Sequence, residues 1–185
     1  PVYEDFVAKV TDKVAALRQG TDAPGTFACE IGALATPDQV DIVERHVNDA
    51  LEKGAKATTG GQRAASGLYF QPTVLRDVTH DMACMREETF GPTLPIMAVA
   101  DEAEAIRLAN DSTYGLACGI WTRDLARAHR FVRDVESGNV WVNAYRRIHW
   151  ALPFGGVKES GYGRDSGVES VLENTQLKTA WIDLA

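Results

Sequence analysis

The chain has 185 residues, of which 45% are hydrophobic and 24% are charged, and this composition is ordinary for a globular protein. Its 19 basic and 26 acidic side chains give a formal net charge of −7, and no basic stripe is present, so nucleic acid is excluded as an expected partner. No apolar run approaches the roughly 18 residues that a membrane span requires, so we expect no membrane partner.

The three cysteines, Cys29, Cys84 and Cys118, are scattered along the chain. They form no CxxC pair and show no spacing with histidine that is typical of a metal site. This usage is typical of a reducing compartment, so we expect a cytoplasmic protein without a disulfide framework and without a metal site.

Two helices are predicted in the first third of the chain. The first covers about residues 2–19, and its amphipathic pattern begins so abruptly that we expect the chain to be a piece of a longer polypeptide. The second opens with Thr36 as N-cap and Pro37 in the first turn, and Gly54 stops it. Its predicted buried stripe consists of Val40, Val43, Val47 and Leu51.

Two extended segments follow the second helix. Residues 55–61 predict a short strand and turn, and residues 67–78 predict an extended segment. Pro72 lies inside the second of these, which favours an edge strand or an interrupted strand.

From residue 96 onward, strand and helix patterns alternate. The predicted strands are continuous apolar runs, as in a sheet buried on both faces, and this alternation indicates βαβ units with a parallel sheet, an α/β fold. The segments are strand 96–100, helix 101–112 with Asp101 as N-cap, strand 115–122, helix 124–138 and strand 139–143. A short helix near residues 168–174 follows, and then a last strand at about 177–185, which must pair with its own sheet or with another chain.

Common catalytic and nucleotide-binding fingerprints are absent from the sequence. It contains no GxGxxG, no Walker-type loop and no GxSxG elbow. His80 and His149 lie far apart, and neither stands near a cysteine or serine in a triad-like pattern. A lone histidine of this kind is more often a surface or core residue than a catalytic one.

Three other stretches are candidates for function: the segment around "EETFGP", residues 109–124 and residues 138–167. "EETFGP" places Glu87 and Glu88 at the edge of an apolar run, where a solvated turn is the ordinary alternative. The loop 144–154 follows the predicted strand 139–143, and ligands of parallel α/β proteins bind at the carboxyl ends of strands. A plain connection is the alternative here, but it would not need Tyr, Trp and Phe within a dozen residues.

Four motifs carry a family resemblance. "EETFGP", "STYGLACGIWTRD", "GNVWVN" and "PFGGVKESGYGR" follow one another in the order and approximate spacing of the C-terminal part of the NAD(P)-dependent aldehyde dehydrogenase superfamily. The first helix, "IGALAT" and "YFQPTVL" also resemble that family. The resemblance implies that residues 1–185 are the C-terminal portion of the catalytic domain, with an oligomerisation strand at about 177–185. The cofactor domain and the nucleophile segment would then lie outside this chain.

The resemblance also implies site residues. Glu88 would accept hydrogen bonds from the nicotinamide-side ribose of NAD or NADP, and Phe90 would lie near the nicotinamide. Arg147, Ile148 and Phe154 would belong to the substrate loop, with Phe154 lining the substrate tunnel. We expect a structural ion pair for Glu87. No cysteine stands in the family's Gly-Gln-x-Cys context, so we expect no catalytic residue in this chain.

The implied function is oxidation of an aldehyde to a carboxylic acid with NAD(P)+ through a cysteine thioester. We expect the chain alone to be inactive, the longer protein to be a homodimer or homotetramer, and an apolar or aromatic aldehyde to be preferred over a semialdehyde. A CoA-acylating or acyl-phosphate-reducing relative and a non-catalytic structural or assembly protein of the same fold remain alternatives.

Overall fold

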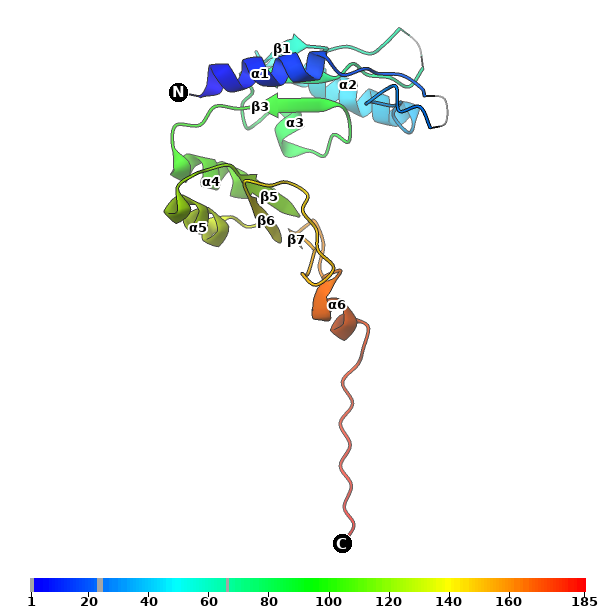
Figure 1. Ribbon diagram of the computed structural model, residues 1–185, viewed down its shortest axis with the longest axis vertical. Helices are drawn as coiled ribbons and strands as arrows, with labels where there is room; N and C mark the ends of the chain where they lie inside the picture. The colour runs from blue at the N-terminus through cyan, green and yellow to red at the C-terminus, as the bar shows by residue number, and fades with distance from the viewer. Residues whose placement is uncertain (1, 23–24, 66) are drawn as a thin grey trace. The chain divides into compact units, whose positions relative to one another are not determined.

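The computed structural model describes residues 2–22, 25–65 and 67–185 (Figure 1). Within these residues the chain forms two compact units, residues 1–99 and residues 100–185. Every helix in the described ranges is too short or too polar to cross a lipid bilayer.

The first unit is built around a three-stranded sheet with the strand order β1-β2-β3. β1 is antiparallel to β2, and β2 is parallel to β3. The elements of this unit are α1 (Tyr3–Ala15), α2 (Pro37–Glu52), β1 (Lys56–Thr59), β2 (Thr73–Arg76), α3 (Ala83–Arg86) and β3 (Thr93–Ile96).

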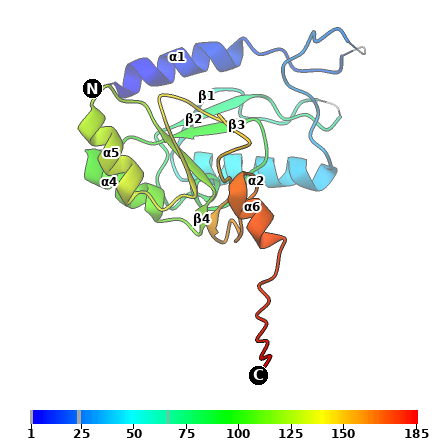
Figure 2. The ribbon, with the colours of Figure 1, turned by 60° about the horizontal axis from the view of Figure 1, so that its bottom comes forward.

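The helices α1 and α2 cover opposite faces of this sheet (Figure 2). On one face, Val74 of β2 packs in a cluster with Val7 of α1. On the other face, the next residue, Leu75, packs in a cluster with Val43 and Val47 of α2. Adjacent residues of a strand point to opposite faces, so β2 buries side chains on both sides of the sheet.

The predicted start of α2 is confirmed, but its buried stripe was predicted wrongly at one end. The Thr36 hydroxyl accepts the backbone N–H of Gln39 at 3.2 Å, and Pro37 occupies the first turn. Leu51 is exposed, whereas Ala50 and His46 are buried. The buried face includes Ala50 and His46, which the predicted apolar stripe omitted, so its centre lies nearer to Val43.

The prediction of an interrupted strand around Pro72 is confirmed, whereas the alternative of an edge strand was wrong. Phe70 forms an isolated antiparallel bridge with Arg63, and the strand β2 begins only at Thr73. Pro72 precedes β2, and β2 is the central strand of its sheet. Proline instead occurs in β3, at Pro95, where β3 has a hydrogen-bonded neighbour on one side only in the sheet order. A strand paired on one side tolerates a missing N–H, so β3 can include Pro95. The prediction of a strand at 96–100 was wrong, because β3 runs from Thr93 to Ile96 and shares only residue 96 with it.

The second unit contains the predicted βαβ pair. Strands β5 and β6 pair in parallel and are connected through α5, while β4 and β7 form a separate antiparallel pair. Both β5 and β6 are only partly buried, so the prediction that they are buried on both faces is not met within this unit. The elements are α4 (Glu102–Asn110), β4 (Tyr114–Gly115), β5 (Ala117–Ile120), α5 (Leu125–Asp134), β6 (Asn139–Val142), β7 (Val157–Lys158) and α6 (Gly167–Glu173).

No strand forms at the C-terminal end of the single chain. Residues 175–185, all of which are described, contain no helix or strand, although a strand was expected at about 177–185. Four apolar side chains there are almost fully exposed: Leu177, Trp181, Ile182 and Leu184. An extended segment becomes a strand only when its backbone groups find a partner, and the single chain offers none.

Candidate functional site

The "EETFGP" segment, residues 87–92, is anchored on α2, beginning with Glu87. The carboxylate of Glu87 accepts a hydrogen bond from Nη2 of Arg45 at 2.9 Å and lies 3.2 Å from Nε2 of His46. These two neighbours, Arg45 foremost, lower the pKa of Glu87. The predicted structural ion pair of Glu87 is therefore confirmed.

Thr89 is anchored on the same helix. Its hydroxyl lies 2.9 Å from Nδ1 of His46, and its carbonyl oxygen accepts a hydrogen bond from Nε2 of Gln39 at 2.6 Å. Both the side chain and the backbone of Thr89 are thus held by α2.

Gly91 approaches α2 so closely that no side chain fits. A Cβ atom at this position would overlap a methyl group of Val43. The next residue, Pro92, ties the segment to the sheet, because its carbonyl oxygen accepts the backbone N–H of Thr73 at 2.8 Å. Glycine is required here by the close approach of the backbone to the helix.

Glu88 and Phe90 alternate with the anchored residues and are exposed. The Phe90 side chain is 72% exposed, and its backbone has a φ of 41°, a costly conformation for a bulky residue. The Glu88 carboxylate makes no hydrogen bond or ion pair to any described residue. The segment therefore presents a carboxylate that can accept hydrogen bonds from ligand hydroxyl groups, beside an accessible aromatic ring.

His46 is the residue of this site that sequence reasoning missed. Only 1% of it is exposed, and it contacts both neighbours of Glu88. The available signal was its place on α2 between Val43 and Val47, since a histidine within an apolar stripe is buried and must find polar partners.

The loop 144–154 of the second unit leaves the end of β6 at Asn143. This residue has a φ of 54°. Its side-chain amide accepts the backbone N–H of Thr122 and donates to the Thr122 carbonyl oxygen, both at 2.8 Å. The point at which the loop begins is therefore fixed against the end of β5.

Trp141 of β6 holds the loop in place. Its indole Nε1 donates a hydrogen bond to the carbonyl oxygen of Arg147 at 2.8 Å. The ring of Tyr145 packs edge-on against Trp141, with ring centroids 5.6 Å apart. The Arg146 side chain, by contrast, makes no hydrogen bond or ion pair with a described residue.

The predicted substrate-loop residues Arg147, Ile148 and Phe154 line one hollow of about 430 Å³ beside β6. Ile148 is exposed, Phe154 is partly buried, and the Arg147 side chain has no partner among the described residues. Trp150 stacks on His149, with ring centroids 5.2 Å apart. The loop therefore gathers apolar side chains and one unpaired guanidinium around a single cavity.

The glycines of "GNVWVN" and "PFGG" allow this loop to close. A Cβ on Gly138 would overlap the carbonyl oxygen of Gly155, so the two backbones are in contact. Phe154 is held further on by two backbone hydrogen bonds with Asp165, each 2.7 Å long. The glycine-rich motif therefore positions Phe154 at the hollow.

The cysteines of the chain are poorly suited to act as thiolates. Burial is the main reason why the pKa of each thiol is raised, to about 11 for Cys84. Cys118 lies within β5 and is only partly buried in this unit. Within residues 2–22, 25–65 and 67–185, no group of histidine, cysteine, aspartate or glutamate side chains could hold a metal ion.

Comparison with known proteins agrees with this architecture. The aldehyde dehydrogenase family model matches residues 1–180, so the chain belongs to the aldehyde dehydrogenase family. It is 44% identical over 172 residues to a 4,4'-diapolycopene aldehyde oxidase of Methylomonas sp, covering 92% of this chain and 31% of that protein. It is 41% identical to succinate-semialdehyde dehydrogenase [NADP(+)] 1 of Mycobacterium tuberculosis, covering 98% of this chain and 39% of that protein.

Solved structures show the same fold. An aldehyde dehydrogenase of Mycobacterium tuberculosis complexed with NAD+ matches 95% of this chain with a TM-score of 0.87 and 39% identity, over 36% of that protein. A mutant aldehyde dehydrogenase of Bacillus cereus matches 100% of this chain with a TM-score of 0.92 and 34% identity, over 37% of that protein. The chain thus spans between about three and four tenths of the length of these relatives.

Proposed function

We propose that this chain is the C-terminal portion of the catalytic domain of an NAD(P)-dependent aldehyde dehydrogenase. In this proposal it supplies Glu88 and Phe90 to the cofactor site and the loop 144–154 to the substrate site. The observation that carries the proposal is the alternation in residues 87–92, where Glu87, Thr89 and Gly91 are fixed on α2 and Glu88 and Phe90 are left accessible.

The residues present fit the nicotinamide half of the cofactor. The carboxylate of Glu88 is an acceptor without a partner among the described residues, and two adjacent ribose hydroxyls are donors of matching spacing. The exposed Phe90 ring offers an apolar face to a flat heterocycle. When bound, the cofactor supplies the hydride acceptor of the reaction.

The proposed reaction converts an aldehyde, water and NAD(P)+ into a carboxylic acid, NAD(P)H and a proton. A cysteine thiolate forms a bond to the aldehyde carbon, that carbon loses a hydride, and water activated by a glutamate then cleaves the thioester and restores the thiol. We place the nucleophile in another part of the longer protein. The raised pKa values of Cys29, Cys84 and Cys118 favour the protonated thiol over the reactive thiolate. The chain by itself is therefore proposed to be inactive.

The hollow beside β6 supports an apolar or aromatic aldehyde as substrate. Ile148, Leu152, Pro153 and Phe154 form much of its wall. The unpaired guanidinium of Arg147 favours a second candidate, an aldehyde that carries a carboxylate, since arginine binds carboxylates through two parallel hydrogen bonds.

The proposal is tested by Glu88→Gln in the longest natural polypeptide that contains this chain. Loss of a charged acceptor should weaken binding of NADH or NADPH and slow hydride transfer, by roughly ten- to a hundredfold in all, with an unchanged melting temperature. The matched control is Glu52→Gln, which removes an exposed carboxylate of α2 that is also unpaired among the described residues. Unchanged cofactor binding with a large loss of stability in Glu88→Gln would make Glu88 structural and contradict the proposal.

A further inference from the structure

The buried imidazole of His46 lies directly behind the "EETFGP" segment. Its two ring nitrogens are both used, one toward the carboxylate of Glu87 at 3.2 Å and one toward the hydroxyl of Thr89 at 2.9 Å. Glu87 and Thr89 are the two chain neighbours of Glu88. One side chain of α2 therefore binds the side chains of both residues that flank the accessible carboxylate.

The chemistry of the partners fixes how the ring is used. A carboxylate only accepts hydrogen bonds, so Nε2 of His46 carries the hydrogen that points to Glu87. The hydroxyl of Thr89 can both donate and accept, so it can pair with Nδ1 of His46. His46 thus hydrogen-bonds the residues on both sides of Glu88, which a phenylalanine or an aliphatic residue cannot do.

Burial makes this contact different from the other anchor of Glu87. Arg45 also holds Glu87, but more than half of the Arg45 side chain is exposed, whereas only 1% of the His46 side chain is. A buried side chain on a helix has few alternative rotamers and little competition from water, so it fixes its partners more tightly than an exposed one.

We propose that His46 is a positioning residue of the cofactor site, which holds the backbone of Glu88 in the conformation that binds the nicotinamide-side ribose. This inference rests on the proposed function of Glu88. Its physical basis is preorganisation: a carboxylate held ready before the ligand arrives loses less conformational freedom on binding.

The test uses His46→Phe, which keeps a buried ring but removes both nitrogens, and Thr89→Val, which removes one partner and keeps the side-chain shape. Both are made in the longest natural polypeptide that contains this chain. Dissociation constants are measured by fluorescence for NADH or NADPH, whichever the protein binds, and by competition for the adenosine half of that dinucleotide. Both variants should weaken dinucleotide binding roughly three- to tenfold, which is the size of a typical net hydrogen-bond contribution. Binding of the adenosine half should stay unchanged, because that half lacks the nicotinamide ribose.

Combination with Glu88→Gln separates this inference from the proposed function. In a Glu88→Gln background, His46→Phe should weaken dinucleotide binding no further, because its effect passes through Glu88. If Glu88→Gln alone leaves binding unchanged, the proposed function of Glu88 fails. If Glu88→Gln weakens binding while the folded variants His46→Phe and Thr89→Val do not, the positioning role of His46 is wrong. The role is also wrong if the loss of binding in these variants adds fully to the loss in Glu88→Gln. An equal loss for the adenosine half would also overturn it and make His46 a structural residue.

Discussion

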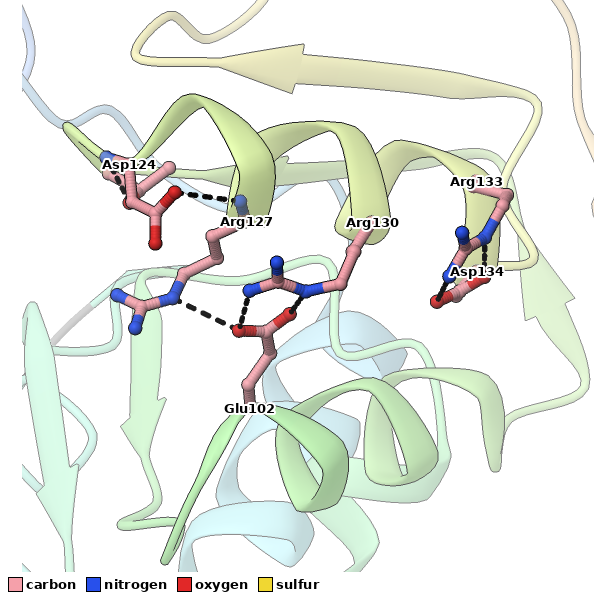
Figure 3. Close-up of polar contacts among 7 residues, drawn as sticks. Glu102, Asp124, Arg127, Arg130, Arg133 and Asp134 are labelled. Atoms are coloured by element: carbon pink, nitrogen blue, oxygen red, sulfur yellow. Dashed lines mark hydrogen bonds and ion pairs between the residues drawn. The ribbon is translucent and has the colours of Figure 1, made fainter.

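Glu102 of α4 and Arg130 of α5 form a two-point ion pair that joins neighbouring helices of the second unit (Figure 3). Nε and Nη2 of Arg130 donate to the two carboxylate oxygens of Glu102 at 2.7 and 2.8 Å. Nε of Arg127, one turn earlier on α5, donates to the same carboxylate at 3.1 Å. A single carboxylate thus binds two arginines, and Arg130, foremost among its neighbours, lowers the pKa of Glu102 to about 2.

Glu102→Gln should lower the melting temperature at neutral pH, because the variant loses the charge that both arginines bind. A carboxyl whose pKa is lower in the folded than in the unfolded state stabilises the fold above the unfolded value. That stabilisation is lost as the pH falls from about 4.5 to about 2. The melting-temperature difference between wild type and Glu102→Gln should therefore be largest at neutral pH and should shrink across that window.

Thermal unfolding at several pH values checks this expectation. Glu159→Gln is the control in the same unit, since the exposed side chain of Glu159 has no partner among the described residues. A deficit in Glu102→Gln that is equal at neutral pH and at the acidic end of the window would show that the ion pairs do not cause it.

Gly91→Ala should destabilise the first unit. The added methyl group would overlap Val43 at a fully buried position of α2, and overpacking of this kind costs about 1–3 kcal/mol. Denaturant unfolding measures the loss. Gly32→Ala is the control, because nothing lies within 4 Å of a Cβ placed there and its φ is not in the left-handed region. Equal stabilities of Gly91→Ala and Gly32→Ala would contradict the close approach of Gly91 to α2.

The elements of the fold could be predicted where local signals are strong. Capping residues mark the starts of helices. The side chains of Thr36, Asp101 and Asp124 each accept a hydrogen bond from the backbone N–H of the residue three positions later. The central position of β2 could not be predicted from Pro72, because the proline's influence depends on whether its missing N–H falls inside the ladder. Strand order is a property of the whole sheet.

The candidate site was predictable from motif residues, but its support was not. Glu88 and Phe90 were identified through resemblance, whereas His46 stands more than forty positions away and makes its contacts only after α2 has packed. The role of Trp141 could not be predicted either. Its sequence context indicates a strand residue, but its indole donates to the carbonyl oxygen of Arg147, six positions later in the loop. Supporting contacts of this kind arise from tertiary packing.

Deleting residues 178–185 should reduce the oligomer size of the longer protein. We propose that this segment pairs with a strand of another subunit, because Trp181, Ile182 and Leu184 are exposed and residues 178–185 make no backbone–backbone hydrogen bond with the described residues. Sedimentation should show smaller species for the deletion, with little change in the helix content. Asp183→Asn is the control, since it leaves the apolar side chains in place. An oligomer of unchanged size after the deletion would refute this role.

The substrate preference of the longer protein should be set by the hollow that Arg147, Ile148 and Phe154 line. We expect higher kcat/KM for phenylacetaldehyde and hexanal than for succinate semialdehyde, because most of the wall is apolar. Betaine aldehyde should be the poorest of the four, since its cation would be repelled by the unpaired guanidinium of Arg147. Removing this charge in Arg147→Ala should raise activity on betaine aldehyde by several-fold and leave the order of the two apolar aldehydes unchanged.

The control for this prediction is Arg146→Ala, which removes the same charge from a neighbouring residue that does not line the hollow. A preference of about tenfold for succinate semialdehyde, equivalent to about 1.4 kcal/mol in transition-state binding, would reverse the expected order. If that preference disappeared in Arg147→Ala and persisted in Arg146→Ala, Arg147 would be the residue that binds the substrate carboxylate. The hydrogen bond from the Trp141 indole to the carbonyl oxygen of Arg147 would then hold the backbone of Arg147 in place.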